Sequence, residues 1–546
     1  MKRKSTNFVT PWGYSVPILA ISLELLPTYF VNLIRRRSVW INSEPSIPFK
    51  QSIDNPGHEH STYILMDSFA IPHWAVINTL AANKLSSESG GKVSTFSFSP
   101  QGSNERKLYE SLGVRSHLRI KLSFISFFKA LNDFFRLVRL IYAGHKVIDL
   151  EINEMNIGLD VYESYLRRGH PTLDLKSRDL YRELWRGVKQ LVFFEPLFSN
   201  KEISAVFVSH DNYVGPGLLA RIAYRYKTPV VLMNPFEINI LQKPFQIYER
   251  FHKYTKYFQA QSDEWKTRHL ENAKNQLNRR ISGEIGVGIM NYQVKSAFTN
   301  HRISRQIRNS KNKNLLILCH DFFDNPHGYA RMMFDDFIDW LVFVTECCHE
   351  NNIDCYIKLH RDFSDIEHRV ILDFQSKHPW VSIVDSEVSY HQLYEEGVRF
   401  VTTCYGSAGH ELPLIGFTVI NSSHNPHIAY SFNYHAKSKS EYRDYLIEQK
   451  PILIRDDLKN EIYEFYAVHT FLMWPDSFNM PSFEGFSRFC QNDFVGSLAL
   501  KYLDDHFSEI EQRVYRNFME AMDSSRVFSV DKSLSQEDQD IFLRID

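Results

Sequence analysis

The 546-residue sequence contains six cysteines, and none precedes Cys319. They form no CxxC pair, so neither a disulfide framework nor a structural zinc site is indicated, and a reducing, cytoplasmic compartment is favoured. Charge of one sign is also lacking, since 63 Lys and Arg residues accompany 64 Asp and Glu residues for a net charge of −1. Proteins that bind nucleic acid usually carry a basic surplus, so we expect no nucleic-acid partner.

Long apolar runs are scarce as well, and the one candidate membrane span is residues 15–34, followed by three arginines at 35–37. Two prolines and a glutamate interrupt it, whereas a span needs about 20 apolar residues with few charges. We expect a packed amphipathic helix there. Peripheral contact with the inner membrane face, aided by the arginines, is the alternative.

Apolar residues nevertheless make up 43% of the chain, which is enough to bury more than one core, and the length exceeds the roughly 100–200 residues of one domain. Short apolar runs alternate with longer helical patterns, as in parallel sheets covered by helices on both faces. The sequence therefore predicts an α/β protein with two doubly wound domains. The predicted strands are residues 63–66, 93–96, 205–208, 230–233, 315–318, 354–357, 381–384, 399–402 and 417–420.

Shifts in composition predict the domain boundaries. Residues 271–313 are polar and rich in Asn, Arg and Lys, which is typical of a linker. The N-terminal domain is then 1–270, with a helix-rich insertion at about 115–200, and the C-terminal domain is 314–485. Residues 486–546 are predicted to form C-terminal helices and a tail.

The clearest candidate for a ligand-binding site in the second domain is the segment in which the strand at 400–403 is followed by small residues and then by a helix. Small residues such as Gly406 and Ser407 allow backbone N–H groups to approach an anion, which the positive end of a helix favours. Glu411, one turn later, is suited to accept hydrogen bonds from a ribose diol. A tight turn with nothing bound is the alternative.

Two further loops follow strands of the same predicted sheet. Lys358, His360 and Arg361 end one strand, at the edge where open α/β sheets bind ligands, and their cationic groups would face the same phosphate. The other loop contains His320, Asp324 and His327. It is interpreted as lining a substrate, with metal binding as the alternative, although no third cluster with ligand spacing is evident.

The motifs as a set resemble the bacterial capsule and surface-polysaccharide biosynthesis proteins, which are glycosyltransferases of the GT-B type. The resemblance is carried by residues 162–167, 209–213 with Arg221, 320–327, 334–340, 357–360, 403–411, 425–427 and 432–437. The K-x-H motif and the small-residue turn followed by Glu resemble those of GT-B transferases that use CMP-activated Kdo or sialic acid. Where the family reads K-P-H-P, this chain has Lys358-Leu359-His360-Arg361 and so lacks both prolines.

The resemblance implies two Rossmann-like domains facing across a cleft, with a nucleotide-sugar donor, CMP-linked by preference, held by the C-terminal one. The acceptor would be a surface polysaccharide or a glycolipid such as lipopolysaccharide, and the transferred sugar Kdo or another acidic sugar. No cofactor or metal is implied. Two alternatives are a CDP-alditol polyol-phosphate transferase of wall polymers and a catalytically degenerate scaffold.

A sugar transferase needs a base for the acceptor hydroxyl or a carboxylate nucleophile. Asp211 is the first candidate, with His210 as its neighbour or substitute, because both follow the strand at 205–208. An Asp that caps the next helix is the alternative. Glu163 is the second candidate, and an exposed position on the helical insertion is its alternative.

Overall fold

The computed structural model describes residues 7–9, 15–17, 62–69, 72–98, 103–234, 238–288, 295–299, 301–328, 332–359, 365–472 and 497–523. The chain divides into two compact units. Unit 1 comprises the chain up to Arg168, Asp174–Gln246 and a C-terminal segment, whereas unit 2 comprises Gly169–Leu173 and Ile247–Pro475. Each unit is built around one six-stranded sheet.

The sheet of unit 2 is wholly parallel, with the order β13-β12-β11-β14-β15-β16. Its strands are β11 (Asn314–Leu318), β12 (Asp354–Lys358), β13 (Ser382–Val384), β14 (Phe400–Thr403), β15 (Thr418–Asn421) and β16 (Tyr434–His435). Counted along unit 2, this is the order 3-2-1-4-5-6 of the Rossmann fold. The direction of progress reverses between β11 and β14, and ligands of such sheets bind at the carboxyl ends of that strand pair.

Helices cover both faces of this sheet, because alternate residues of its strands are apolar on both sides. One face packs on α11 (Phe337–Glu350), α12 (Asp365–Lys377) and α15 (Lys439–Glu448). The other packs on α13 (Tyr390–Glu395), the single turn α14 (Ala408–Glu411) and η5 (Pro413–Ile415). Unit 2 also contains η3 (Gln246–Lys253), α9 (Tyr254–Gln259), α10 (Asp263–Ile281), α16 (Asp456–Ala467) and η6 (Val468–Leu472).

The sheet of unit 1 repeats this plan with the order β10-β9-β8-β3-β4-β5, in which only β10 is antiparallel. Its strands are β3 (Tyr63–Asp67), β4 (Lys92–Ser97), β5 (Ser116–Arg119), β8 (Ile203–Val208), β9 (Val230–Met233) and β10 (Ile238–Leu241). Progress along the chain reverses between β3 and β8. The helical insertion is the long connection between β5 and β8.

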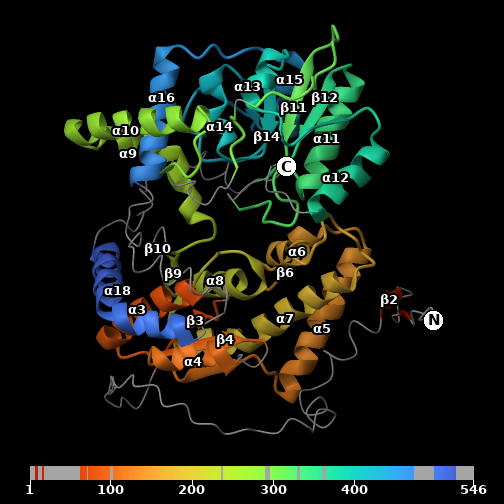
Figure 1. The fold of residues 1–546 in the computed structure, drawn as a ribbon. Helices are drawn as coiled ribbons and strands as arrows, with labels where there is room; N and C mark the ends of the chain where they lie inside the picture. Colours follow the sequence, from red (N-terminus) through yellow and green to blue (C-terminus); the bar gives the residue numbers. More distant parts are fainter. Residues whose placement is uncertain are drawn as a thin grey trace. The chain divides into compact units, whose positions relative to one another are not determined.

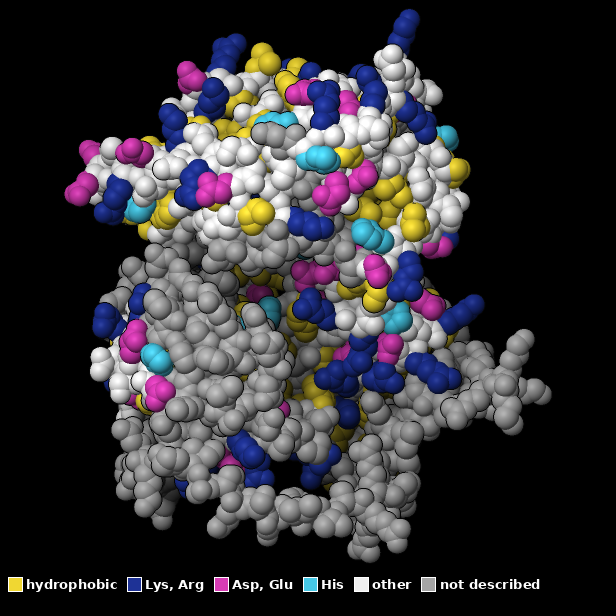
Figure 2. Space-filling model, in the orientation of Figure 1, with side chains coloured by type: hydrophobic (Ala, Val, Ile, Leu, Met, Phe, Trp, Pro, Cys, Tyr) yellow, Lys and Arg dark blue, Asp and Glu magenta, His cyan; other side chains and the backbone are white. Residues whose placement is uncertain are grey.

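The helices of unit 1 again cover both faces (Figure 1). They are α3 (Pro72–Ser89), α4 (Ser103–Ser111), α5 (Phe124–Tyr142), α6 (Gly158–Leu166), α7 (Arg178–Ser199), α8 (Leu218–Arg225) and α18 (Ser497–Asp523). Minor elements are η1 (Val147–Asp149), η2 (Tyr213–Gly217), and the hairpins β1 (Asn7–Val9)–β2 (Ser15–Pro17) and β6 (Glu151–Ile152)–β7 (Met155–Asn156). Lys and Arg side chains gather over the region of α7 (Figure 2).

The C-terminal helix α18 packs against the other elements of unit 1, although it lies far from them in sequence. Ile510, Val514 and Phe518, at helical spacing, join the core formed with α3 and the strands, and the rings of Phe518 and Phe207 are 5.9 Å apart. The amphipathic pattern of this segment predicted a helix, but the sequence carried no sign of which core the helix would join.

All nine predicted strands are confirmed to within one or two residues, and so is the α/β class with two Rossmann-like sheets. The strands that the sequence analysis missed are short, polar or at edges, such as β5, β10 and β16. The predicted linker was partly wrong, because α10 continues to Ile281. Of residues 15–34, Ser15–Pro17 form a strand instead of a helix, and the rest lies outside the described residues. No described helix is long and apolar enough to cross a membrane.

Candidate functional site

The loops that follow β11 and β14 meet at the point where the strand order of unit 2 reverses. The His320 ring stacks on Phe337 at 5.2 Å and lies edge-on to Tyr405 at 4.8 Å. The Tyr405 hydroxyl donates to the Asn325 carbonyl at 2.8 Å. These contacts place the two predicted ligand-binding loops side by side, at the edge where such sheets bind ligands.

The remaining polar residues of the β11 loop shape its turns. The Asn325 side chain accepts from the amide of His327 at 3.0 Å, and the amide of Asp324 donates to the Asp321 carbonyl at 3.3 Å. His327 is buried. Among the described residues no three His, Cys, Asp or Glu side chains are grouped to hold a metal ion. The loop is therefore held in a fixed shape by its own hydrogen bonds.

The small-residue turn after β14 has a backbone that requires glycine. Gly406 has φ +125°, and a Cβ atom there would meet no atom of the described residues within 4 Å. The helix that follows, α14, is one turn long, so its dipole attracts an anion less strongly than a long helix would. Any binding of an anion by Ser407 thus depends on local backbone groups and neighbouring cations.

Glu411 is engaged within the protein. Its Oε1 atom accepts from Arg280 Nε at 2.6 Å and lies 2.5 Å from Arg280 Nη2, and its Oε2 atom accepts from Ser407 Oγ at 3.2 Å. Both side chains of the ion pair are buried. Binding of a ribose diol by Glu411 stays a prediction, and it requires a ligand to displace one of these partners.

Lys358 contacts the loop that follows β13. Its Nζ donates to the Ser386 carbonyl at 2.8 Å and lies 5.7 Å from the centre of the Tyr390 ring, both of which follow β13. In the sheet, β11 separates Lys358 from β14. That Lys358 and Ser407 face one phosphate stays a prediction. His360 and Arg361 lie outside the described residues.

Two buried histidines, His410 and His427, pack beneath the backbone of the turn after β14, next to Gly409. His410 Nδ1 and His427 Nε2 are 3.1 Å apart, and the lack of a side chain at Gly409 admits the His427 ring, which a Cβ atom would approach to 2.4 Å. Burial holds the pKa of both imidazoles well below the usual value. Both rings are therefore neutral packing groups at pH 7.

In unit 1, the loop after β8 brings together two of the predicted catalytic carboxylates. Asp211 and Glu163 are both buried, near Asp160 and Arg221, and Arg221 Nε donates to Asp160 Oδ2. No hydrogen-bond partner is recorded among the described residues for Asp211 Oδ2 or for Arg221 Nη2. Buried polar atoms without a partner are rare and mark sites for a ligand or water.

Burial raises the proton affinity of the acids in this cluster. Burial raises the pKa of Asp160 to about 7, although Arg221 opposes the shift. Burial also raises the pKa of Asp211 to about 6, with Arg221 opposing and the nearby Glu163 adding to the rise. An acid with a pKa near the working pH exchanges a proton effectively, so Asp211 is suited to general acid–base work.

The alternatives for both carboxylates are not supported. Glu163 is buried on α6, so an exposed position is wrong. No side-chain cap is recorded at the start of η2, which follows Asp211, so the capping alternative is wrong for the described residues. Gly217 allows the chain to turn tightly here, because a Cβ atom would lie 2.3 Å from the backbone of Asn212.

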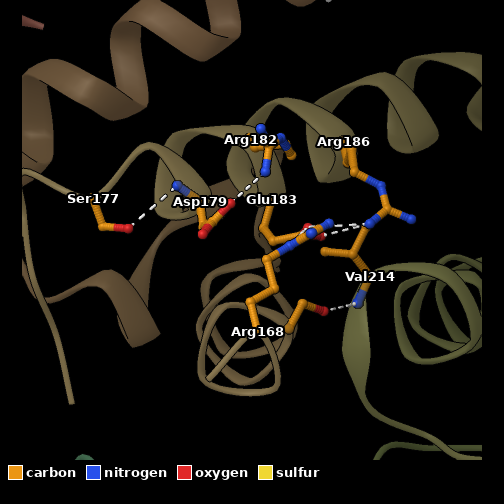
Figure 3. A network of polar contacts seen from close by, with 8 residues as sticks. Arg168, Ser177, Asp179, Arg182, Glu183, Arg186 and Val214 are labelled. Atoms are coloured by element: carbon orange, nitrogen blue, oxygen red, sulfur yellow. Dashed lines mark hydrogen bonds and ion pairs between the residues drawn. The ribbon is translucent and has the colours of Figure 1, made fainter. Parts of the chain in front are cut away.

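Polar contacts between α6, α7 and the loop hold this cluster in place (Figure 3). The buried Glu183 of α7 accepts from Arg168, at the end of α6, and from Arg186. The Val214 amide donates to Ser164 Oγ of α6 at 2.7 Å, and Gln190 Nε2 of α7 donates to the Gly215 carbonyl at 2.7 Å. Both helices thus anchor the loop that carries Asp211.

His210 differs from Asp211 because it is exposed. Its ring stacks on Trp74 at 5.3 Å, and its Nδ1 atom lies 2.8 Å from Ser209 Oγ. Trp74 is in the first turn of α3, which follows β3. The His210–Trp74 pair therefore joins the two strand ends at which the order of unit 1 reverses.

The sequence analysis missed four residues of these sites: Asp67, Trp74, Asp160 and Arg280. Asp160 and Glu163 are three residues apart on one helix, and that spacing places both on one face, so this pair was detectable. Asp67 ends β3, and burial raises its pKa to about 7. Arg280 had no local signal, since its partner lies 131 residues away.

Comparisons with known proteins find only remote structural likenesses. No protein-family model and no curated protein matches the sequence. The Thermosulfurimonas dismutans KpsC β-Kdo 2,4 transferase is 11% identical, over 48% of this chain and 79% of that one, with a TM-score of 0.28. The Methanocaldococcus jannaschii UDP-GlcNAc 2-epimerase in complex with UDP-GlcNAc and UDP is 9% identical, over 74% of this chain and 98% of that one, with a TM-score of 0.22. The glycotransferase of kitacinnamycin is 9% identical, over 85% of this chain and 98% of that one, with a TM-score of 0.18. At such scores the likeness carries no argument about substrate.

Proposed function

We propose that the protein is a glycosyltransferase that moves a sugar from a nucleotide-activated donor to a surface polysaccharide or glycolipid acceptor. The observation that carries the proposal is that both Rossmann-type sheets place polar loops at the reversal of their strand order. In unit 1 these loops hold carboxylic acids near neutral pKa, and in unit 2 they form a glycine turn beside a buried cation. A nucleotide-sugar enzyme of this class needs an acid–base group and an anion-binding edge.

In this proposal unit 2 binds the donor nucleotide. The Gly406 turn offers backbone groups to a phosphate, and Arg280 is linked to that turn through Glu411 and Ser407. A CMP-linked donor carrying Kdo or another acidic sugar is favoured by the sequence resemblance.

Asp211 acts in this proposal either as the base that takes the proton of the acceptor hydroxyl, or as the nucleophile that bonds to the anomeric carbon as the nucleotide leaves. Its pKa of about 6 leaves it largely ionised at pH 7, and Arg221 stabilises the carboxylate. Glu163 contributes by raising the proton affinity of Asp211. Leaving-group charge would be neutralised by protein cations in unit 2, and no metal step is invoked.

The test has two parts. Thermal unfolding is measured with CMP, CDP, UDP and GDP at equal concentration, since a nucleotide that binds only the folded protein raises the melting temperature; we expect CMP to produce the largest rise. Release of nucleotide from CMP-Kdo, CMP-sialic acid and UDP-sugars is then followed. The proposal is contradicted if no nucleotide raises the melting temperature and no donor is turned over.

A matched pair of variants isolates the proposed catalytic acid. Asp211→Asn should lower the rate of nucleotide release roughly 10²-fold or more. It should keep the rise in melting temperature that the nucleotide causes. Asp373→Asn, an exposed carboxylate of α12, should change neither. Equal turnover by both variants would remove Asp211 from the mechanism.

A nucleotide-binding scaffold without turnover is the second candidate. It is favoured by the protein partners that already occupy Glu411 and Lys358. A rise in melting temperature with one nucleotide, combined with no release from any donor, would identify it.

A further inference from the structure

The start of α5 in unit 1 exposes a cluster of large apolar side chains. Phe124, Ile125 and Phe128 are 73%, 82% and 52% exposed, and the rings of Phe124 and Phe128 are 4.9 Å apart. Burying such side chains removes unfavourable contact with water, so three in one helical turn are unusual on a protein surface. Exposure this high means that they project outward and do not line a concave pocket.

The fold itself does not require these side chains. Ser123 caps α5, because its Oγ accepts from the amide of Ser126 at 3.2 Å, and the buried face of the helix is supplied further along by Ala130 and Phe134. The helix would begin at the same place with polar residues in its first turn. The apolar cluster is therefore available for a partner.

Basic side chains surround the cluster. Lys121 and Lys129 are exposed on either side of it in sequence. The adjoining Phe127 contacts Trp185 of α7, with ring centres 6.0 Å apart, and Lys189 Nζ lies 5.8 Å from the Trp185 ring. The exposed face of α7 beside Trp185 carries Arg178, Arg182, Arg186 and Lys189, spaced by about one helical turn. Arg182 and Arg186 are paired with Asp179 and Glu183, so the charge offered to a partner comes mainly from Lys121, Arg178 and Lys189.

We propose that this surface, the α5 tip (Phe124, Ile125, Phe128 and the flanking Lys121), docks unit 1 onto an anionic lipid bilayer. Projecting aromatic and aliphatic side chains enter the boundary between headgroups and acyl chains, and adjacent cations bind anionic headgroups. Charge complementarity favours this occupant, because the apolar tip is bordered by cations. The proposal is independent of the glycosyl-transfer function and concerns a different segment from residues 15–37.

Vesicle co-sedimentation tests the proposal in the absence of any donor. The full-length protein should bind vesicles of phosphatidylcholine mixed with phosphatidylglycerol, and bind pure phosphatidylcholine vesicles less. Added salt should weaken the binding, since it screens surface charges. The triple variant F124S/I125S/F128S should lose binding by about tenfold or more. Its thermal unfolding should match the wild type, because the three side chains are exposed.

A control variant removes three exposed apolar side chains elsewhere. Ile366, Leu372 and Leu453 of unit 2 are 53%, 58% and 68% exposed, and I366S/L372S/L453S should bind anionic vesicles as the wild type does. K121E should weaken binding to the mixed vesicles only. Equal loss in both triple variants, or no binding by the wild type, would overturn the proposal. The proposal would also be overturned if F124S/I125S/F128S still bound vesicles but differed from the wild type in oligomeric state, measured by sedimentation. That result would identify a second copy of the chain as the partner.

Discussion

Arg280 of α10 and Glu411 of α14 form a buried ion pair, with 6% and 4% of their side chains exposed. The end of α10 suits a cation, because helix C-termini favour positive charge. The pair ties the helix of the expected linker to the turn after β14. It therefore connects a segment without strand character to the proposed donor site.

Removing one member of this pair should destabilise the protein strongly, because the other charge remains buried. Arg280→Met should lower the free energy of unfolding by about 3–5 kcal/mol, measured by urea denaturation. Arg280→Met combined with Glu411→Met should recover much of that loss. Arg279→Met is the control, since its pair with Glu284 is exposed, and it should change stability little. Additive losses in the double variant would contradict the prediction.

Replacing Asp211 should change how stability depends on pH. Because burial raises the pKa of Asp211 to about 6 from 3.8, the folded protein binds its proton more tightly than the unfolded chain does. The stabilisation from protonated Asp211 is therefore complete below about pH 4, and it is lost as the pH rises through about 6. Between pH 4 and pH 8 the wild type should therefore lose about 2–3 kcal/mol of stability that Asp211→Asn keeps.

Urea denaturation at pH 4 and pH 8 measures this difference. Arg221 opposes the effect and Glu163 adds to it, so both charges must be kept in the variant. Asp373→Asn, at an exposed carboxylate, should show the wild-type dependence. The same pH dependence in Asp211→Asn would show that the acid is not buried as described.

His210 should affect turnover without affecting stability, because it is exposed at the strand-end crevice of unit 1. In His210→Ala the stack on Trp74 is lost, and the rate of donor turnover should fall by roughly tenfold or more. The melting temperature should stay within about 1 °C of the wild type, since surface substitutions change little. His145→Ala, at another exposed histidine of unit 1, should leave both unchanged. A fall in melting temperature with normal turnover would give His210 a structural role only.

Tyr442 should be a stability residue and nothing more. Its hydroxyl accepts from Trp340 Nε1 at 2.9 Å and, since Thr402 donates to the Ile420 carbonyl, donates to Thr402 at 2.5 Å. Tyr442→Phe leaves the buried indole N–H without a partner and should cost about 1–3 kcal/mol, measured by urea denaturation. Tyr445→Phe loses a half-exposed bond to Glu441 and should cost less. Nucleotide binding should be unchanged in both.

Local patterns were enough to predict the strands and the edge at which the chemistry gathers. A strand such as β11 is apolar on both faces because helices cover both, and the loop after it reaches the carboxyl edge by chain direction alone. Asp211 and His210 were found in this way. They differ in role because one is buried and the other exposed, which no local pattern distinguishes.

By itself the sequence determined that this chain forms parallel sheets with polar loops at their carboxyl ends, because periodicity and residue type act over a few neighbouring positions. Only the tertiary structure decided the partners. Glu411 is paired with Arg280 from 131 residues away, Lys358 is turned to the loop after β13, and α18 completes the core of unit 1. Such contacts depend on burial and on charge neutralisation between distant segments, and these are properties of the folded chain alone.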